Sequence, residues 1–258
     1  MCGLGVVKKL KELSEHKKII ILISLFAASL IAVMLFGEIE QYQSYHNFAD
    51  SRTFFAVPNF FDVSSNLLFA VVGMTGLRFA FTHVRREAQY SWITMFAGVT
   101  LVSFGSGYYH WNPNDGTLVW DRLPMMIGFM GLFSAVLTEF VNPKLEKFML
   151  VPALAIGLSS VIYWRYTGDL RFYIWLQVVT FLVITAVLFM YEGRFTHSRY
   201  LLYTFGLFML SKFTELNDRE LYSVNNSLLS GHTLKHIISA LAVFYLYLML
   251  KRREPREE

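Results

Sequence analysis

The sequence contains little charge and almost no cysteine. Asp, Glu, Lys and Arg make up 16% of its 258 residues, whereas a soluble domain carries about 25%. The single cysteine, Cys2, excludes an internal disulfide and says little about the cellular compartment. The few charged residues lie in short clusters between long apolar runs, which excludes an ordinary soluble domain.

Hydrophobic residues dominate, at 55% of the chain, and the mean hydropathy is +0.43. This composition predicts an all-α fold, a polytopic membrane helix bundle. We expect eight spans, at about 19–36, 60–81, 91–111, 118–140, 147–164, 171–191, 200–217 and 231–250. The first run is longer than the apolar part of a signal peptide and lacks a small-residue cleavage site, so a retained helix is expected.

The basic residues indicate how the bundle is oriented. With eight spans, sixteen Lys and Arg residues fall on the side of the two termini and four on the other side, while three lie within spans. The positive-inside rule then places both termini in the cytoplasm. Because the basic residues flank the spans, the membrane explains the net charge of +4 better than a nucleic-acid partner does.

Four ionisable residues are predicted to share one layer of the membrane, near its outer surface. His232 and His236 are four apart, so a helix places both on one face with Cβ atoms about 5–6 Å apart. His110 ends the third span and Asp121 begins the fourth. Ionisable groups in a bilayer cost about 2.5–3.5 kcal/mol each, so they usually face the bundle interior and carry function.

These residue types suit a catalytic zinc site. Three neutral imidazoles and one water form a tetrahedral site with an open position, and zinc lowers the pKa of its bound water to about 7. The predicted ligands are His110, His232 and His236. Asp121 is placed to act as a general base. Ser106, one helical turn before His110, is placed to hydrogen-bond a substrate carbonyl or oxyanion.

Each residue also has a simpler interpretation. A lone His110 suits the membrane interface, and Asp121 can form a rim ion pair with Arg122, whose side chain is expected to extend to the interface. Ser106 lies between two glycines, which favour close helix packing. Lys235 is expected to point away from the histidine face and to find a partner in the bundle or at the interface. The other four histidines, His16, His46, His83 and His197, are expected to lie in solvated loops.

The combined pattern resembles that of the alkaline ceramidases. Ser106-x3-His110, the stretch Asp121-Arg122-Leu123-Pro124-Met125 and His232-x3-His236 carry the resemblance, together with the segment 59–67. These enzymes belong to a superfamily of multi-span hydrolases that includes the adiponectin and progestin receptors. The resemblance covers roughly residues 50–250.

The resemblance implies a seven-helix core that binds zinc through the three histidines, with Asp121 and Ser106 in catalysis. The implied activity is that of a zinc-dependent amidase that cleaves the N-acyl bond of ceramide, a membrane lipid, to a sphingoid base and a fatty acid. Residues 1–36 would then form a cytoplasmic N-terminus and one additional transmembrane helix. Residues 37–258 would form the ceramidase-like domain and a short tail, with the active site toward the non-cytoplasmic face.

The resemblance is weaker for calcium. Eukaryotic alkaline ceramidases carry an acidic Asp-Trp-x-Glu-x-Asn loop that binds Ca²⁺, with a further Glu near the first core helix. The corresponding residues here are 46–52, and Asn59 takes the place of that Glu. Asp50 and Asn59 are the two candidate ligands, so carbonyls and water would have to supply most of the six to eight oxygens that calcium takes.

Two other functions stay open at this point. An intramembrane serine hydrolase could use Ser106, His110 and Asp121, although the sequence around Ser106 lacks the Gly-x-Ser-x-Gly elbow and the pair His232 and His236 would have no role. A lipid-sensing receptor or a transporter could hold zinc as a structural ion.

Overall fold

The computed structural model describes residues 2–84 and 86–256, which form helices and, within these residues, no β-strand. The long helices are α2 (Glu15–Leu35), α4 (Leu67–His83), α5 (Gln89–Trp111), α6 (Asp115–Phe140), α7 (Leu145–Thr167), α8 (Arg171–Met190), α9 (Arg199–Leu216) and α11 (Gly231–Arg252). Shorter helices are α1 (Cys2–Lys11), α3 (Phe60–Ser65), α10 (Asp218–Val224) and the 3₁₀ helix η1 (Gln43–His46). The predicted all-α helix bundle is confirmed.

Each expected span coincides with a long helix, and the span at 60–81 consists of α3 and α4 together. Six segments of the described chain are long and apolar enough to cross a membrane: Glu15–Leu35, Phe60–His83, Asp115–Phe140, Leu145–Thr167, Arg171–Met190 and Gly231–Arg252. These segments indicate an integral membrane protein. The helices α5 and α9 are not among the six, and both carry polar residues that line the site described below.

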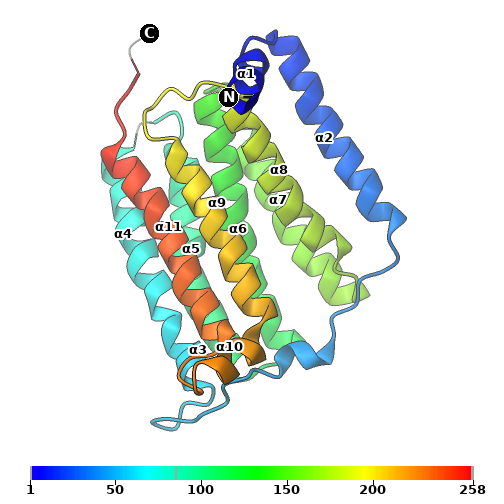
Figure 1. The fold of residues 1–258 in the computed structure, drawn as a ribbon, viewed down its shortest axis with the longest axis vertical. Helices are drawn as coiled ribbons and strands as arrows, with labels where there is room; N and C mark the ends of the chain where they lie inside the picture. The colour runs from blue at the N-terminus through cyan, green and yellow to red at the C-terminus, as the bar shows by residue number, and fades with distance from the viewer. Residues whose placement is uncertain (1, 85, 257–258) are drawn as a thin grey trace.

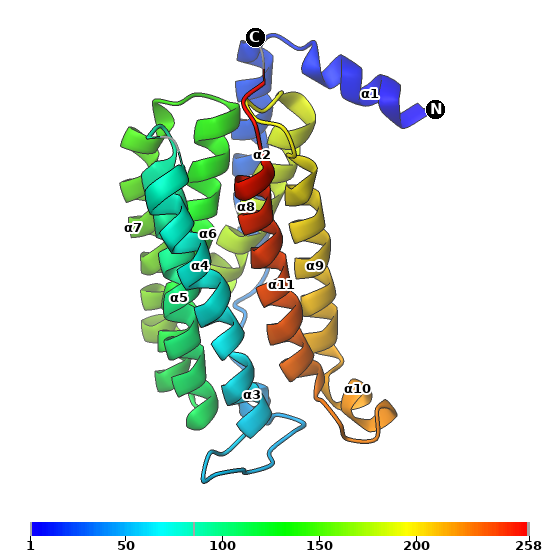
Figure 2. The same ribbon diagram turned by 90° about the vertical axis from the view of Figure 1, so that its left-hand side faces the viewer.

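The long helices of the bundle run side by side, and α2 stands at its edge next to α8 (Figure 1). Only 6% of the most apolar stretch of α2 is buried in the protein. Both termini lie at one end of the bundle, and α3 and α10 lie at the opposite end (Figures 1 and 2). The histidines predicted to bind metal belong to this second end, where α5 finishes and α11 begins.

Close packing of α5 against α6 fixes the depth of the site residues. A Cβ atom at Gly98 or Gly105 of α5, or at Gly131 of α6, would collide with backbone atoms of the partner helix. Glycine is therefore required at these three crossing points, as is usual where membrane helices approach closely. The helix packing predicted for the glycines around Ser106 is confirmed at Gly105, whereas a Cβ at Gly107 would meet open space.

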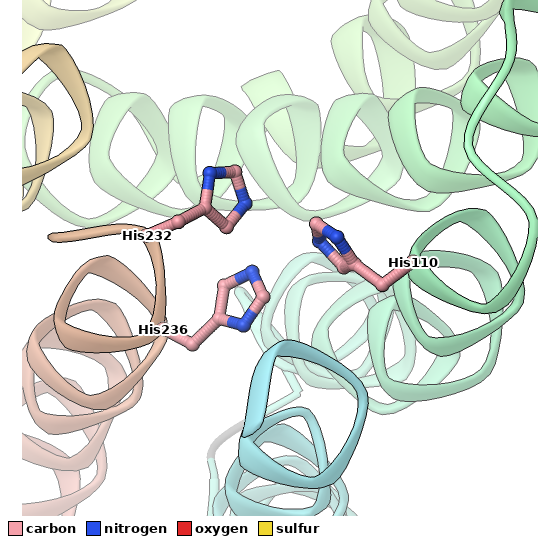
Figure 3. Close-up of side chains that lie close together, drawn as sticks. All are labelled: His110, His232 and His236. Atoms are coloured by element: carbon pink, nitrogen blue, oxygen red, sulfur yellow. The ribbon is translucent and has the colours of Figure 1, made fainter. Parts of the chain in front are cut away.

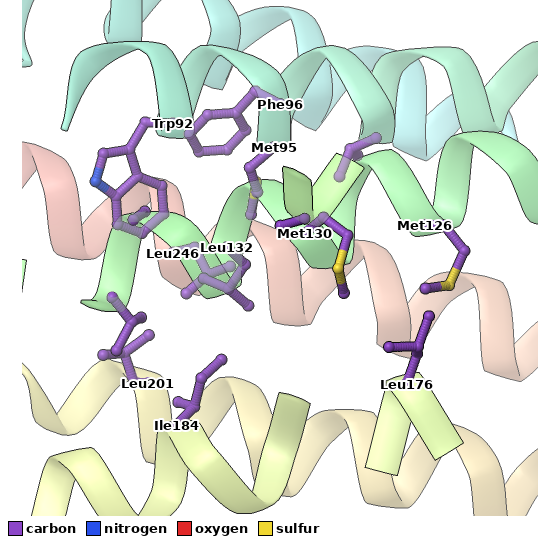
Figure 4. Close-up of a cluster of buried hydrophobic side chains, with 14 of the residues drawn as sticks. Trp92, Met95, Phe96, Met126, Met130, Leu132, Leu176, Ile184, Leu201 and Leu246 are labelled. Atoms are coloured by element: carbon purple, nitrogen blue, oxygen red, sulfur yellow. The ribbon is translucent and has the colours of Figure 1, made fainter. Parts of the chain in front are cut away.

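The interior beyond the site is lined by apolar side chains. Figure 4 shows side chains of α5, α6, α8, α9 and α11 meeting there, among them Trp92, Phe96, Met126, Met130, Leu176, Ile184, Leu201 and Leu246. At the end of the bundle where the termini lie, the buried carboxylate of Glu139 accepts hydrogen bonds from Trp92 Nε1 at 2.7 Å and from Arg253 Nη1 at 2.6 Å. This pairing satisfies charges that would otherwise be costly to bury.

Candidate metal centre

His110 sits in the last turn of α5 because the following residues end that helix and start the next. Asn114 caps α6 by accepting hydrogen bonds from the backbone N–H groups of Gly116 and Thr117, an arrangement that stabilises a helix start. The carbonyl of His110 accepts a hydrogen bond of 2.8 Å from Asn59 Nδ2. The end of α5 is thereby tied to the start of α3.

His232 and His236 lie in the first two turns of α11, whose start is held by two carboxylates. Asp218 accepts a 2.7 Å hydrogen bond from the backbone N–H of His232. Asp62 accepts hydrogen bonds from the side chains of Ser230 at 3.2 Å and Thr233 at 2.6 Å. Carboxylates favour the positive end of a helix dipole, so these contacts fix the position and direction of the helix that presents both imidazoles.

The three imidazoles converge. Their ligand atoms all lie within 4.8 Å of one another, and the ring centroids of His110, His232 and His236 are 4.7 to 5.0 Å apart. Figure 3 shows the rings reaching toward a common point, two from α11 and one from α5. The residues are 1 to 4% exposed. The predicted convergence of helices distant in sequence is confirmed, and the cluster can hold a metal ion.

The environment of the rings fits a metal ion. Neither Nδ1 nor Nε2 of the buried His110 has a hydrogen-bond partner among residues 2–84 and 86–256. A buried imidazole with no polar partner pays an uncompensated desolvation cost, and metal coordination would remove this cost. His236 uses Nδ1 in a 2.8 Å hydrogen bond with Ser65 Oγ, which leaves Nε2 available.

An aromatic residue that the sequence did not predict covers two of the three histidines. Phe48, in the linker before α3, lies with its ring centroid 4.7 Å from that of His110 and 4.8 Å from that of His232. It is 9% exposed. A hydrophobic cover of this kind limits water access and lowers the local dielectric constant.

The expectation that His46 is solvated is wrong. Its side chain is 9% exposed, and its ring nitrogens lie 2.9 Å from Tyr109 Oη and 3.1 Å from Asp115 Oδ1. These contacts fasten the linker over the end of α5. His16 and His83 are exposed as expected but belong to α2 and α4 rather than to loops.

Ser106 and Asp121 are brought next to the histidines. Both are buried, at 2% and 6% exposed, and the hydroxyl of Ser106 interacts with the carboxylate of Asp121. Together with His236 they line one end of an apolar cavity between α5, α6, α9 and α11, which we call the apolar slot. The five predicted site residues therefore come together, and their roles in catalysis stay predictions.

The apolar slot runs from the site into the bundle. Its walls include Met95, Val99, Val102, Phe129, Leu132, Phe208 and Leu246. Along α5 the slot extends from Ser106 to Met95, which is about 16 Å at the rise of an α-helix. A linear hydrocarbon chain matches such a space in shape and polarity.

A second cavity, the polar chamber, adjoins the slot. It lies between the 39–45 linker, α6, α8 and α9, and its polar lining includes Gln41, Tyr45, Arg122, Tyr173, Gln177, Lys212 and Glu215. Asp121 and Lys235 line both cavities. The polar chamber and the apolar slot thus meet at Asp121.

A network of charged side chains lines the chamber on the side of the histidines. Glu215 accepts hydrogen bonds from Lys212 at 2.8 Å, from Lys235 at 2.6 Å and from Tyr45 at 3.0 Å. Burial, together with the negative charge of Glu215, holds the pKa of Tyr45 well above its usual value, so the phenol stays a donor. Lys235 has its expected partner in the bundle, but it does not point away from the histidines, because its Nζ is 3.4 Å from His232 Nε2.

The candidate calcium ligands are engaged elsewhere. Arg52 donates to Asp50 through Nε at 2.8 Å and through Nη2 at 2.6 Å, a bidentate pair that occupies both carboxylate oxygens. Burial by itself would raise the pKa of Asp50, but these hydrogen bonds hold it below its usual value. Asn59 directs its amide nitrogen toward the carbonyl of His110. These residues do not fit a calcium site, because a guanidinium fills the position that the cation would need.

Comparison with known protein families assigns most of the chain to one family. No match was found among curated proteins. A family of unknown function, DUF6962, matches residues 62–255, a region that begins within α3 and contains all five predicted site residues. Because this match covers about three-quarters of the sequence, the chain belongs to the family of unknown function DUF6962.

Proposed function

We propose that this protein is a zinc-dependent intramembrane amidase that hydrolyses the N-acyl bond of ceramide or a related N-acyl lipid, giving an amine and a fatty acid. The observation that carries the proposal is the convergence of three buried imidazoles beside Ser106 and Asp121 at one end of the apolar slot. The resemblance to alkaline ceramidases supplies the reaction class.

The proposed arrangement in the membrane has eight spans, with α5 and α9 completing the six most apolar segments. Both termini would be cytoplasmic and the metal centre would lie toward the non-cytoplasmic face. The excess of basic residues on the side of the termini supports this orientation. The termini lie at the end of the bundle opposite α3 and α10 (Figure 1), and His232 and His236 lie at the start of α11, which follows α10, so the arrangement agrees with it.

Zinc suits the donor set. His110, His232 and His236 would hold the ion, as three neutral imidazoles do in catalytic zinc sites that keep a fourth position open. When bound, the ion supplies a Lewis acid and a water whose pKa is lowered to about 7.

Asp121 and Ser106, beside the histidines, would take different roles in the reaction. Asp121 would take a proton from the attacking water and deliver it to the nitrogen of the leaving amine. Ser106 would donate its hydroxyl proton to the carbonyl oxygen of the amide as negative charge develops there. The apolar slot would hold the acyl chain, so that the amide bond lies at Asp121 with its carbonyl carbon toward the histidines.

The serine hydrolase alternative has less support. A serine nucleophile needs a hydrogen bond to its general base, yet the described residues include no hydrogen bond between Ser106 and His110, and both ring nitrogens of His110 lack partners. The receptor or transporter alternative is compatible with the same cavities and a structural metal ion. It differs in predicting no turnover.

The test uses purified full-length protein in detergent, with metal analysis followed by incubation with N-acyl lipids. We expect about one zinc per chain, release of fatty acid and free amine, and loss of both activity and zinc in His110→Ala. Asp121→Asn should retain zinc and lose turnover. The matched control is His83→Ala, because His83 is exposed and lies on α4 outside the cluster.

The outcomes separate the three functions. Activity that survives complete zinc removal would favour the serine hydrolase. Zinc that stabilises the fold with no turnover of any N-acyl lipid would favour the receptor or transporter. Loss of turnover in Asp121→Asn with zinc retained would support the amidase.

A further inference from the structure

The polar chamber contains a buried cation that forms no ion pair with any described residue. Arg122 is 6% exposed. Its Nη2 donates to Gln41 Oε1 at 2.5 Å, and its Nη1 has no hydrogen-bond partner within the described segments. Its guanidinium carbon lies 4.0 Å from the ring centroid of Trp164 and 4.9 Å from that of Tyr173. The expectation that Arg122 extends to the interface is therefore wrong.

An unpaired guanidinium in the protein interior calls for an explanation. Buried charges in proteins are normally paired, because desolvation of an isolated ion costs several kcal/mol. The planar guanidinium suits carboxylate and phosphate oxygens in particular, since it offers donors in a fixed fork. The aromatic rings of Trp164 and Tyr173 hold the fork in place but supply no counter-charge.

The other charges of the chamber do not compensate Arg122. Glu215 already forms ion pairs with Lys212 and Lys235 and accepts a hydrogen bond from Tyr45 as well. Two further carboxylates line the chamber: Glu40, which is exposed, and the buried Asp121, which the proposed reaction requires. Among the described residues, no carboxylate forms a hydrogen bond with the guanidinium of Arg122, whose side-chain acceptor is the neutral amide of Gln41.

Arg122 and Asp121 are neighbours in sequence but face different cavities, which indicates how a bound lipid would be oriented. Asp121 lines both cavities, whereas Arg122 lines the polar chamber and not the apolar slot. Successive residues of an α-helix point about 100° apart, which accounts for this division. A lipid with its acyl chain in the slot and its amide at Asp121 would place the amine-side group in the chamber, facing Arg122.

We infer that the preferred lipid carries an anionic oxygen group, a carboxylate or a phosphate, on the amine side of its amide bond, and that Arg122 selects this group. This inference rests on the proposed amidase function. An anionic oxygen would give Nη1 the acceptor that it lacks and would place a counter-charge in direct contact with the guanidinium. A neutral diol head group would leave Arg122 uncompensated.

The test compares pairs of lipids with the same acyl chain, of which one member carries an anionic group on the amine side and the other a neutral hydroxyl. N-palmitoylserine and N-palmitoylserinol form the carboxylate pair, and N-palmitoyl-phosphoethanolamine and N-palmitoylethanolamine form the phosphate pair. We expect zinc-loaded protein to show a higher kcat/KM for the anionic member of at least one pair, and the pair with the larger ratio identifies the anion. Hydrogen bonds to charged groups predict a preference of roughly 10- to 100-fold, expressed in KM.

Variants of Arg122 distinguish selection from a structural role. Arg122→Gln should remove the preference by raising KM for the anionic lipids, with little change for the neutral ones, and Arg122→Lys should keep part of it. The control is Arg165→Gln, because Arg165 is an exposed arginine at the end of α7. An equal loss for charged and neutral lipids in Arg122→Gln would overturn the inference.

Binding measurements keep the inference separate from the proposed reaction. The anionic lipids should raise the Tm of wild-type protein more than their neutral partners do, and this difference should disappear in Arg122→Gln. Hydrolysis of all four lipids without a charge preference would overturn the inference and leave the amidase function standing. Charge-selective binding without hydrolysis would support the role of Arg122 and contradict the amidase function.

Discussion

The hydroxyl oxygen of Ser65 lies 2.8 Å from Nδ1 of His236 and 3.1 Å from the carbonyl oxygen of Asp62. A carbonyl can only accept, so the single hydroxyl proton of Ser65 points to Asp62. Ser65 must then accept a hydrogen bond from Nδ1–H of His236. This contact selects the tautomer whose Nε2 is free to bind metal, as partners of metal-binding histidines commonly do.

Ser65→Ala should weaken zinc binding without removing any ligand. Loss of such a supporting contact typically costs about 10- to 100-fold in metal affinity, and we expect an effect of this size in a competition titration with a chromogenic chelator. Ser64→Ala is the control, because the Ser64 hydroxyl bonds the carbonyl of Phe61 in its own helix. Equal zinc affinities in the two variants would contradict the role assigned to Ser65.

Gly105→Ala should destabilise the bundle at the crossing of α5 and α6. The added Cβ would collide with the carbonyl of Trp120, and overpacking of this kind costs about 1–3 kcal/mol. Because Gly105 adjoins Ser106, we also expect reduced activity. Gly107→Ala places the same methyl group in open space and should change the unfolding free energy by less than about 0.5 kcal/mol. Thermal unfolding in detergent measures both, and a neutral Gly105→Ala would refute the tight crossing.

The fold and the histidine cluster could be predicted because they depend on patterns along the chain. Apolar runs of bilayer length define the helices. Since the helices alternate in direction, residues at their ends share a depth, and this pattern links His110 to His232 and His236. Neither argument needs a side-chain contact.

Phe48 and Arg122 could not be assigned because their environments come from distant segments. Phe48 lies in a linker of mixed composition, and only the folded chain places it on two of the histidines. Arg122 lies in the first turns of its predicted span, where extension of the side chain to the interface is the usual outcome. Its burial depends on Trp164 of α7 and Gln41 of the linker, which no local pattern connects to α6.

Phe48→Ala should speed the loss of zinc. Removing the ring exposes His110 and His232 to water and to chelators, so metal release into excess EDTA should be several-fold faster than in wild-type protein. Truncating a buried phenylalanine also costs about 3–5 kcal/mol. Phe48→Leu keeps an apolar cover and is the milder variant. Its rate of zinc release should lie between those of wild-type protein and Phe48→Ala.

Phe55→Ala controls for loss of an aromatic side chain from the same linker, since Phe55 is 91% exposed. Its rate of zinc loss should equal that of wild-type protein. A Phe48→Ala variant that folds and releases zinc at the wild-type rate would show that the ring does not shield the site.

Calcium should have no effect on this protein. Arg52 already occupies both oxygens of Asp50, so a calcium-selective chelator should leave the Tm and the rate of lipid hydrolysis unchanged, and added Ca²⁺ should not restore activity to zinc-depleted protein. Isothermal titration with Ca²⁺ gives a direct measurement. Saturable binding that Asp50→Asn abolishes would contradict this prediction.

The pair formed by Asp50 and Arg52 should make a pH-dependent contribution to stability. Burial opposes ionisation of Asp50, but the hydrogen bonds from Arg52 outweigh it and hold the pKa of the carboxyl below its usual value. A carboxylate whose pKa is lower in the folded than in the unfolded state stabilises the fold above the unfolded value, about 3.9, and loses this effect as the pH falls through the folded value. Asp50→Asn should therefore lower the Tm at pH 7, and the difference from wild-type protein should shrink below about pH 4.

Glu220→Gln, a change at an exposed carboxylate near the same end of the bundle, should show no such trend. A Tm difference for Asp50→Asn that stays constant from pH 7 to below pH 4 would mean that the ion pair does not contribute to stability.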